Sequence, residues 1–149
     1  MNNNNNLDAI YNKLSDGMMQ FNSTEEKMEY LSNALHDSLE HYYWVGFYFP
    51  HEKEMQIGPS AGPPACAAIG YEGVCGAAFK SGKSVIVTNV DEFPGHIACD
   101  PNSKSEIVIP VKNSDDVVIA LLDVDSDRLG AFNDTDAVFL EKLVNEISA

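Results

Sequence analysis

The sequence has few basic residues, and this shortage limits what the protein can bind. Nine lysines and arginines stand against 23 aspartates and glutamates, giving a formal net charge of −14. Such a surface repels nucleic acids and anionic membranes, so we exclude both as partners. Arg128 is the only arginine, so a polyanionic ligand would lack its usual bidentate partner. A cationic or zwitterionic ligand fits this charge better.

The chain also lacks long apolar runs and a recognisable targeting segment. No run approaches the roughly 18 apolar residues that a membrane span requires. Met1 and the five asparagines after it have neither the basic nor the apolar region of a signal peptide. We therefore expect a cytoplasmic protein in which residues 1–6 form a disordered, Asn-rich tail. The length suits a single domain over residues 7–149.

Cysteine is scarce too, with Cys66, Cys75 and Cys99 as the only three. An odd number argues against a purely structural disulfide framework. In a reducing cytoplasm, a disulfide between two of them would more often be transient and catalytic than structural.

Apolar periodicity and helix caps predict an α+β fold. Adjacent strands joined by turns indicate a mainly antiparallel sheet with helices packed on it. We expect Gly58–Pro64 to be a loop and residues 89–105 to be a long connection of functional importance. The predicted helices cover 7–18, 23–39, 73–81 and a last segment capped by Asn133, and the predicted strands cover 43–49, 55–57, 84–88, 106–111 and 117–124.

Cys99 is the first candidate for a reactive thiol, because it lies on the polar stretch Gly95–Asp100. His96, three residues upstream, could accept the thiol proton. Asp100 acts in the opposite direction, since a neighbouring negative charge disfavours the thiolate. A lone histidine is also more often a loop residue bonded to the backbone. Local electrostatics alone therefore do not decide for Cys99.

The other two cysteines have weaker local arguments. Cys75 lies near the start of a predicted helix, where free N–H groups favour an anion, although packing is the commoner role there. Cys66 follows the stiff Pro63–Ala65 segment and is either a held thiol or an inert loop residue. Together with Cys99 and His96 they supply zinc-ligand types, but the close pairs of structural zinc sites are missing, so we expect no metal.

The acidic residues form a second group. Asp123 and Asp125 are two apart at the end of an apolar run, so on a strand they point to one face. Glu106 begins another predicted strand. Such carboxyls could bind a cation, hold a substrate ammonium or share a proton, or simply be solvated at a strand end. Trp44 is by default a core aromatic, and it could also wall a small pocket.

These features together resemble one known family. The matching segments, in order, are Trp44–Tyr48, Pro64–Cys66, Gly73–Gly76, Phe93–Asp100, Ser105–Pro110 and Leu122–Ser126. They are similar to the free methionine-(R)-sulfoxide reductases, a family built on a single GAF domain. The resemblance implies a GAF-like antiparallel β-sheet flanked by helices over residues 7–149, with the N- and C-terminal helices packed on one side.

The resemblance also implies roles for the cysteines. Cys99 matches the catalytic cysteine, which attacks the sulfoxide sulfur, releases methionine and is left as a sulfenic acid. Cys66 matches the resolving cysteine that closes a disulfide with it, and Cys75 matches a third, auxiliary cysteine. From the residues alone, either Cys66 or Cys75 could be the partner of Cys99.

The remaining implications concern the substrate and the partners. Glu106, Asp123 and Asp125 match the acidic residues around the substrate, and Trp44 matches a pocket aromatic. Thioredoxin would reduce the disulfide, and no cofactor is expected. The sequence does not show the oligomeric state, and a homodimer is one possibility. The alternative function is a non-catalytic GAF module that senses a small molecule or redox state, since a fold does not fix a function.

Overall fold

The computed structural model describes residues 3–96 and 99–147. Within them the strands form one six-stranded antiparallel sheet, in the order β3-β2-β1-β6-β5-β4. None of the helices in this part of the chain has the length and apolar character needed to cross a lipid bilayer. The elements are α1 (Asn3–Met18), α2 (Thr24–Ser38), β1 (Trp44–Pro50), β2 (Met55–Ala61), β3 (Ala68–Ile69), α3 (Val74–Ser81), β4 (Val85–Val87), the 3₁₀ turn η1 (Val90–Glu92), β5 (Ser105–Lys112), β6 (Val118–Ser126) and α4 (Asp134–Asn145).

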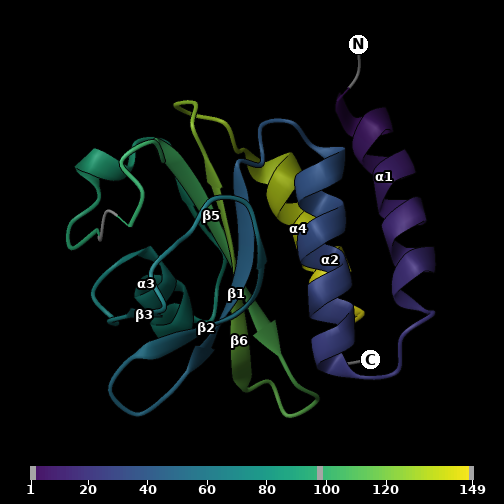
Figure 1. Ribbon diagram of the computed structural model, residues 1–149, viewed down its shortest axis with the longest axis horizontal. Helices are drawn as coiled ribbons and strands as arrows, with labels where there is room; N and C mark the ends of the chain where they lie inside the picture. The colour runs from purple at the N-terminus through teal and green to yellow at the C-terminus, as the bar shows by residue number, and fades with distance from the viewer. Residues whose placement is uncertain (1–2, 97–98, 148–149) are drawn as a thin grey trace.

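The helices are divided unequally between the two faces of the sheet (Figure 1). On one face, α2 packs on β1 and β2, α4 packs on β5, and α1 packs on α2 and α4. On the other face, α3 packs on β5 and β6, beside the long connection between β4 and β5. This arrangement confirms the predicted α+β fold, with the N- and C-terminal helices on one side.

The main core lies between the sheet and the three helices of the first face, and strand alternation builds it. On β6, Leu122 and Val124 belong to this core and are fully buried. Asp123, between them, points to the opposite face, because successive side chains of a strand alternate. One strand thus supplies both the apolar core and a buried carboxyl.

Two predicted helix starts are confirmed by their caps. The Ser23 hydroxyl accepts a hydrogen bond from the Glu26 backbone N–H at 3.1 Å, opening α2. Asn133 and Asp136 form a reciprocal capping box at the start of α4. The side-chain oxygens satisfy backbone N–H groups that have no partner within the helix.

The structure corrects three expectations. Helix α1 begins at Asn3, within the segment predicted to be a disordered tail, because extending an existing helix needs no new nucleus. Strand β2 continues to Ala61, into the predicted loop. Its Gly58 and Pro59 fall at the register shift opposite Phe47, where a residue without an N–H is tolerated. The short β3 and η1 are elements that apolar periodicity did not predict.

Candidate active site

The register of the three central strands brings the predicted site residues together. Asp125 on β6 is paired with Trp44 on β1 and with Glu106 on β5. Asp123, two residues earlier, is paired with Gly46 on one side and with Val108 on the other. The carboxyls of Glu106, Asp123 and Asp125 thus come from adjacent positions of the sheet.

These side chains line one pocket on the face of the sheet opposite α2 and α4. Of the seven residues to which the family resemblance gave roles, six are among its lining residues, and the seventh, Cys66, is joined to it through a disulfide to Cys99. The lining residues are Trp44, Tyr48, Pro64, Ala65, Ile69, Gly70, Gly73, Val74, Cys75, His96, Cys99, Asp100, Ser103, Glu106, Asp123 and Asp125.

Gly46 gives the Trp44 ring its place in this pocket. A Cβ added at Gly46 would lie 2.4 Å from the Cη2 atom of Trp44 and 2.7 Å from the Cβ of Ser60. The indole therefore lies where a side chain at position 46 would be. Gly46 is paired with Asp123, so the ring lies beside that carboxyl's position in the sheet. A larger residue at Gly46 would displace the ring from the pocket wall.

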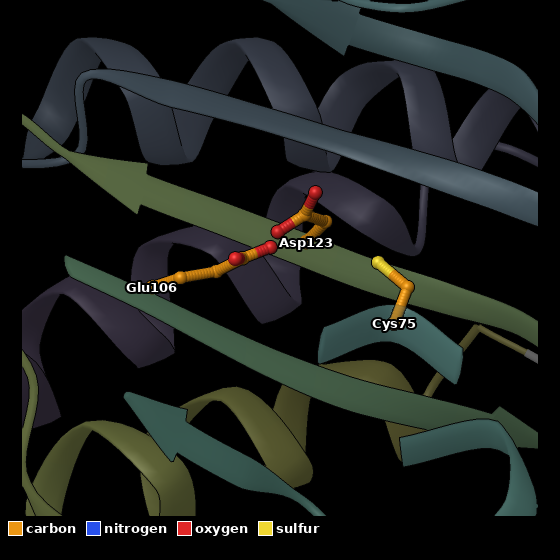
Figure 2. Close-up of side chains that lie close together, drawn as sticks. All are labelled: Cys75, Glu106 and Asp123. Carbon is orange, nitrogen blue, oxygen red and sulfur yellow. The ribbon is translucent and has the colours of Figure 1, made fainter. Parts of the chain in front are cut away.

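The three carboxyls do not all ionise readily (Figure 2 shows two of them). Burial, followed by the negative charges of Asp123 and Asp125, raises the pKa of Glu106 well above its usual range. Burial raises the pKa of Asp125 in the same way, with the charges of Asp123 and Asp100 adding to it. The pKa of Asp123 is also raised by burial, but hydrogen bonds from Glu106 and Cys75 oppose this rise. Asp123 is therefore the first of the three to carry a charge.

Asp123 retains an unused acceptor. Among the described residues, its Oδ1 atom is the one buried side-chain nitrogen or oxygen that has no hydrogen-bond partner. His96 lies nearby, with Nδ1 3.9 Å from Glu106 Oε1. That distance exceeds a hydrogen bond, and burial lowers the pKa of His96, which favours a neutral imidazole. The unpartnered Asp123 oxygen is therefore an acceptor that a cationic group would satisfy.

Cys66 and Cys99 form a disulfide, with their Cα atoms 5.4 Å apart. Cys66 follows β2 and Cys99 precedes β5, so the bond connects loops from the two halves of the sheet across the pocket face. This pairing also rules out the four-ligand zinc set of Cys66, Cys75, Cys99 and His96 in this structure, since two of its sulfurs are bonded to each other.

Cys75 is the free cysteine of the described part of the chain and is buried. Burial, with added repulsion from Asp123, raises the pKa of its thiol well above the ordinary value. The start of α3 has no side-chain cap, but its N–H groups do not outweigh this burial. A neutral thiol is a poor nucleophile.

Two tyrosines that the sequence analysis did not single out hold the disulfide loops. The Tyr48 hydroxyl donates a hydrogen bond to the backbone oxygen of Cys66 at 2.8 Å. The Tyr43 hydroxyl donates a hydrogen bond to Asp100 Oδ2 at 2.9 Å. Tyr48 could have been predicted from the sequence. It lies four residues after Trp44, and strand side chains an even number of residues apart point to the same face. Nothing in the sequence links Tyr43 to Asp100.

A close backbone approach fixes the start of the Cys99 loop. Gly95 has a φ of +78°, a conformation that favours glycine. A Cβ at this position would lie 2.4 Å from the backbone oxygen of Glu72. The Cys99 loop thereby packs against the segment that leads into α3 and Cys75.

The fold and this pocket define a class of protein. The GAF domain family model matches residues 23–149. The GAF domain-containing protein A of Dictyostelium discoideum is 45% identical over 105 residues, which cover 69% of this chain and 66% of that protein. The protein is therefore a GAF-domain protein.

More specific similarity narrows the class. Free methionine-R-sulfoxide reductase of Escherichia coli (strain K12) is 37% identical over 144 residues, covering 95% of this chain and 84% of that protein. The matching protein of Saccharomyces cerevisiae is 39% identical over 70% of this chain, although the match spans only 61% of its length. The structure of the Neisseria meningitidis enzyme in complex with its substrate superimposes with a TM-score of 0.92 and 32% identity, covering 99% of this chain and 89% of that one. This chain belongs to the free methionine-R-sulfoxide reductase family.

Proposed function

We propose that this protein reduces free L-methionine-(R)-sulfoxide to methionine, with Cys99 as the nucleophile, Cys66 as the resolving cysteine and thioredoxin as the reductant. The observation that carries the proposal is the Cys66–Cys99 disulfide at a pocket that also contains three carboxyls. The substrate-bound structure of the Neisseria meningitidis family member supports the choice of substrate.

The first step is attack of the Cys99 thiolate on the sulfoxide sulfur. The sulfoxide oxygen takes up a proton, methionine is released, and Cys99 is left as a sulfenic acid. Cys66 then attacks the Cys99 sulfur, forming the S–S bond and releasing the oxygen as water. Two thiols of thioredoxin supply the two electrons and two protons that reopen the disulfide. Cys75 has an auxiliary part only, because its thiol is buried and held neutral.

The carboxyls divide the remaining tasks. Glu106 is the proton donor, because burial and the neighbouring charges raise its pKa and favour the protonated carboxyl. Asp123 is the anion that receives the substrate ammonium at its unpartnered Oδ1. Asp125 adds to the negative field, and the Trp44 ring contacts the substrate methyl group. A methionine within a peptide has no ammonium, which accounts for selectivity toward the free amino acid.

This division assigns the whole reaction to one GAF domain, residues 7–149, working in the cytoplasm. The pocket, the two disulfide-bonded cysteines and all three carboxyls lie within those residues. Sedimentation velocity of the purified protein tests whether this domain is a monomer or a homodimer in solution.

The test is thioredoxin-coupled turnover with separated R and S sulfoxides, each free and within a peptide. We expect turnover of the free R form alone. Mass spectrometry after one equivalent of substrate should find the Cys66–Cys99 disulfide and a reduced Cys75. Absence of turnover on the free R form by fully reduced protein would refute the proposal.

A sensory role is the second candidate. It is supported by a structure from Burkholderia vietnamiensis named a putative GAF sensor protein, which superimposes with a TM-score of 0.91 at 32% identity over 99% of this chain. A sensor would be oxidised once and stop, whereas an enzyme completes many cycles with excess reductant. Counting the turnovers per protein molecule therefore separates the two functions.

A further inference from the structure

Three residues with potential metal-ligand atoms, one thiol and two carboxyls, meet in the pocket. The Cys75 sulfur, one Glu106 oxygen and one Asp123 oxygen all lie within 4.8 Å of one another. They come from α3, β5 and β6, and Figure 2 shows the two carboxyls pointing toward each other with the thiol beside Asp123. All three residues are buried, so each ligand atom is held by packed elements rather than by a loop.

An independent observation indicates that this cluster is short of a positive charge. Asp123 is 6% exposed, and its Oδ1 atom has no hydrogen-bond partner. A buried, unpartnered carboxylate oxygen is costly unless a cation or donor compensates it. The residues that line the pocket include four acidic side chains and no lysine or arginine. A cationic ligand would supply the compensating charge.

The thiol decides which kind of cation fits. Calcium and magnesium take six or more oxygen ligands and do not select sulfur. A site with one sulfur and two carboxylate oxygens suits Zn²⁺ and its spectroscopic substitute Co²⁺. Zinc bonds of 2.0–2.3 Å place tetrahedral ligand atoms roughly 3.3–3.8 Å apart, so small side-chain rotations would close the cluster around an ion.

We propose that Cys75, Glu106 and Asp123 form a binding site for one Zn²⁺ ion. Binding displaces the thiol proton of Cys75 and the proton held by Glu106 to solvent, with no change of oxidation state. His96, whose Nδ1 lies 3.9 Å from Glu106 Oε1, is a further ligand type in the same pocket. This set is distinct from the four-ligand combination of Cys66, Cys75, Cys99 and His96, because it needs neither disulfide-bonded cysteine.

The site also predicts regulation, which rests on the proposed function. Glu106 and Asp123 are the groups assigned to the proton transfer and to the substrate ammonium. An ion bound to both would occupy the substrate position and remove the donor proton. Zinc should therefore compete with free methionine-(R)-sulfoxide.

The protein with its disulfide formed is the best sample for the binding test. Cys75 is then the free thiol, so a thiolate-to-cobalt charge-transfer band on Co²⁺ addition can come only from it. We expect one Co²⁺ per chain with such a band, and displacement of Co²⁺ by one equivalent of Zn²⁺. Isothermal titration with Zn²⁺ gives the affinity directly.

Matched variants identify the ligands. Cys75→Ser should abolish the charge-transfer band and weaken Zn²⁺ binding by at least about 100-fold, the upper end of what loss of even an outer partner costs. Asp123→Asn should weaken binding with the fold intact, as judged by circular dichroism. Asp125→Asn, in the same pocket but outside the three ligands, should retain the band. Absence of Co²⁺ binding to the native protein, or a band that survives in Cys75→Ser, would overturn the site.

A competition experiment keeps the two proposals separate. Free methionine-(R)-sulfoxide should raise the Co²⁺ concentration needed for half-saturation, if the substrate uses Asp123. Metal binding that ignores the sulfoxide would contradict the substrate placement and the zinc regulation, and leave the metal site standing. Sulfoxide turnover without any metal binding would refute the site and leave the reductase function intact.

Discussion

The two faces of the sheet are built from the same strands but carry opposite chemistry. On the face covered by α2 and α4, the strands contribute a continuous apolar core that includes Leu122 and Ile107. On the face covered by α3, the sequence neighbours of these two residues, Asp123 and Glu106, line a pocket. This pocket contains an unpartnered oxygen and carboxyls of raised pKa. A shift of one residue in register would exchange the two faces completely.

The difference separates stability from chemistry. Buried, crowded carboxyls oppose folding when they are charged, whereas buried leucines favour it. The apolar core on the face covered by α2 and α4 stabilises the fold. The face covered by α3 can therefore contain buried carboxyls that do not themselves favour folding. Variants of adjacent residues on one strand can therefore change one property and spare the other.

The largest expected effect is on the pocket face, at the nucleophile. Cys99→Ser should lower sulfoxide turnover by at least about 10³-fold, since a serine hydroxyl is not activated in this acidic setting. Unfolding of the reduced proteins by urea should be almost unchanged, because Cys99 lies on a loop outside both apolar clusters. A variant that retained full turnover would overturn the assignment of Cys99.

The next largest effect is expected on the face covered by α2 and α4. Leu122→Ala should lower the free energy of unfolding by about 2–5 kcal/mol, because it leaves a cavity in a fully buried core. Turnover measured well below the new melting temperature should stay within a few-fold of the native value. Loss of turnover in a folded Leu122→Ala protein would show that the two faces are coupled.

A smaller effect concerns the raised pKa of Glu106. A folded protein that keeps a proton which the unfolded chain has lost becomes less stable as the pH rises. This contribution is fully present below the unfolded-state pKa of about 4.3 and is lost as the pH passes through the higher folded-state pKa. Glu106→Gln, which cannot ionise, should therefore gain stability relative to the native protein as the pH rises, by about 1.4 kcal/mol for each pH unit between the unfolded-state and folded-state pKa values.

Urea unfolding of both proteins at pH 5 and pH 8 checks this expectation. Glu141→Gln is a suitable control, since Glu141 is exposed on α4 and should change stability equally at both values. If the difference between native and Glu106→Gln protein did not grow with pH, Glu106 would be charged in the folded state and could not be the proton donor.

The smallest expected effect is on the closing of the disulfide. Tyr48→Phe removes the hydroxyl bonded to the backbone oxygen of Cys66, worth about 0.5–1.5 kcal/mol. Disulfide formation after a single turnover, followed by rapid acid quench, should slow by up to about tenfold. Tyr43→Phe makes the matching change on the Cys99 side, through Asp100. Unchanged rates in both variants would show that the loops need no support from these two hydroxyls.

The sequence predicted those parts of the fold that repeat with a regular period. Helix spacing, caps and the two-residue spacing of Asp123 and Asp125 all translate directly into which face a side chain occupies. Strand β2 was cut short in the prediction because Gly58 and Pro59 are typical of loops. The structure accommodates both at a bulge opposite Phe47, which only the pairing with β1 reveals.

The site was predictable where strands carry it and less so where loops do. The residues alone left Cys66 and Cys75 open as partners of Cys99, because no periodicity relates positions on separate loops. In the structure Cys66 is the residue bonded to Cys99, and Cys75 is buried on α3. The approach of His96 to Glu106 likewise depends on how the long connection folds over the sheet.

The disulfide that crosses the pocket face has a consequence for how long the protein lasts in each state. It closes a chain segment of 33 residues, which in a chain-entropy model stabilises the folded form by roughly 4 kcal/mol. The disulfide-bonded form should then have the higher melting temperature, and reduction of the disulfide should lower it. The melting temperature thereby reports the redox state of the protein. Under conditions that keep the disulfide oxidised, the protein would be in its thermally more stable form.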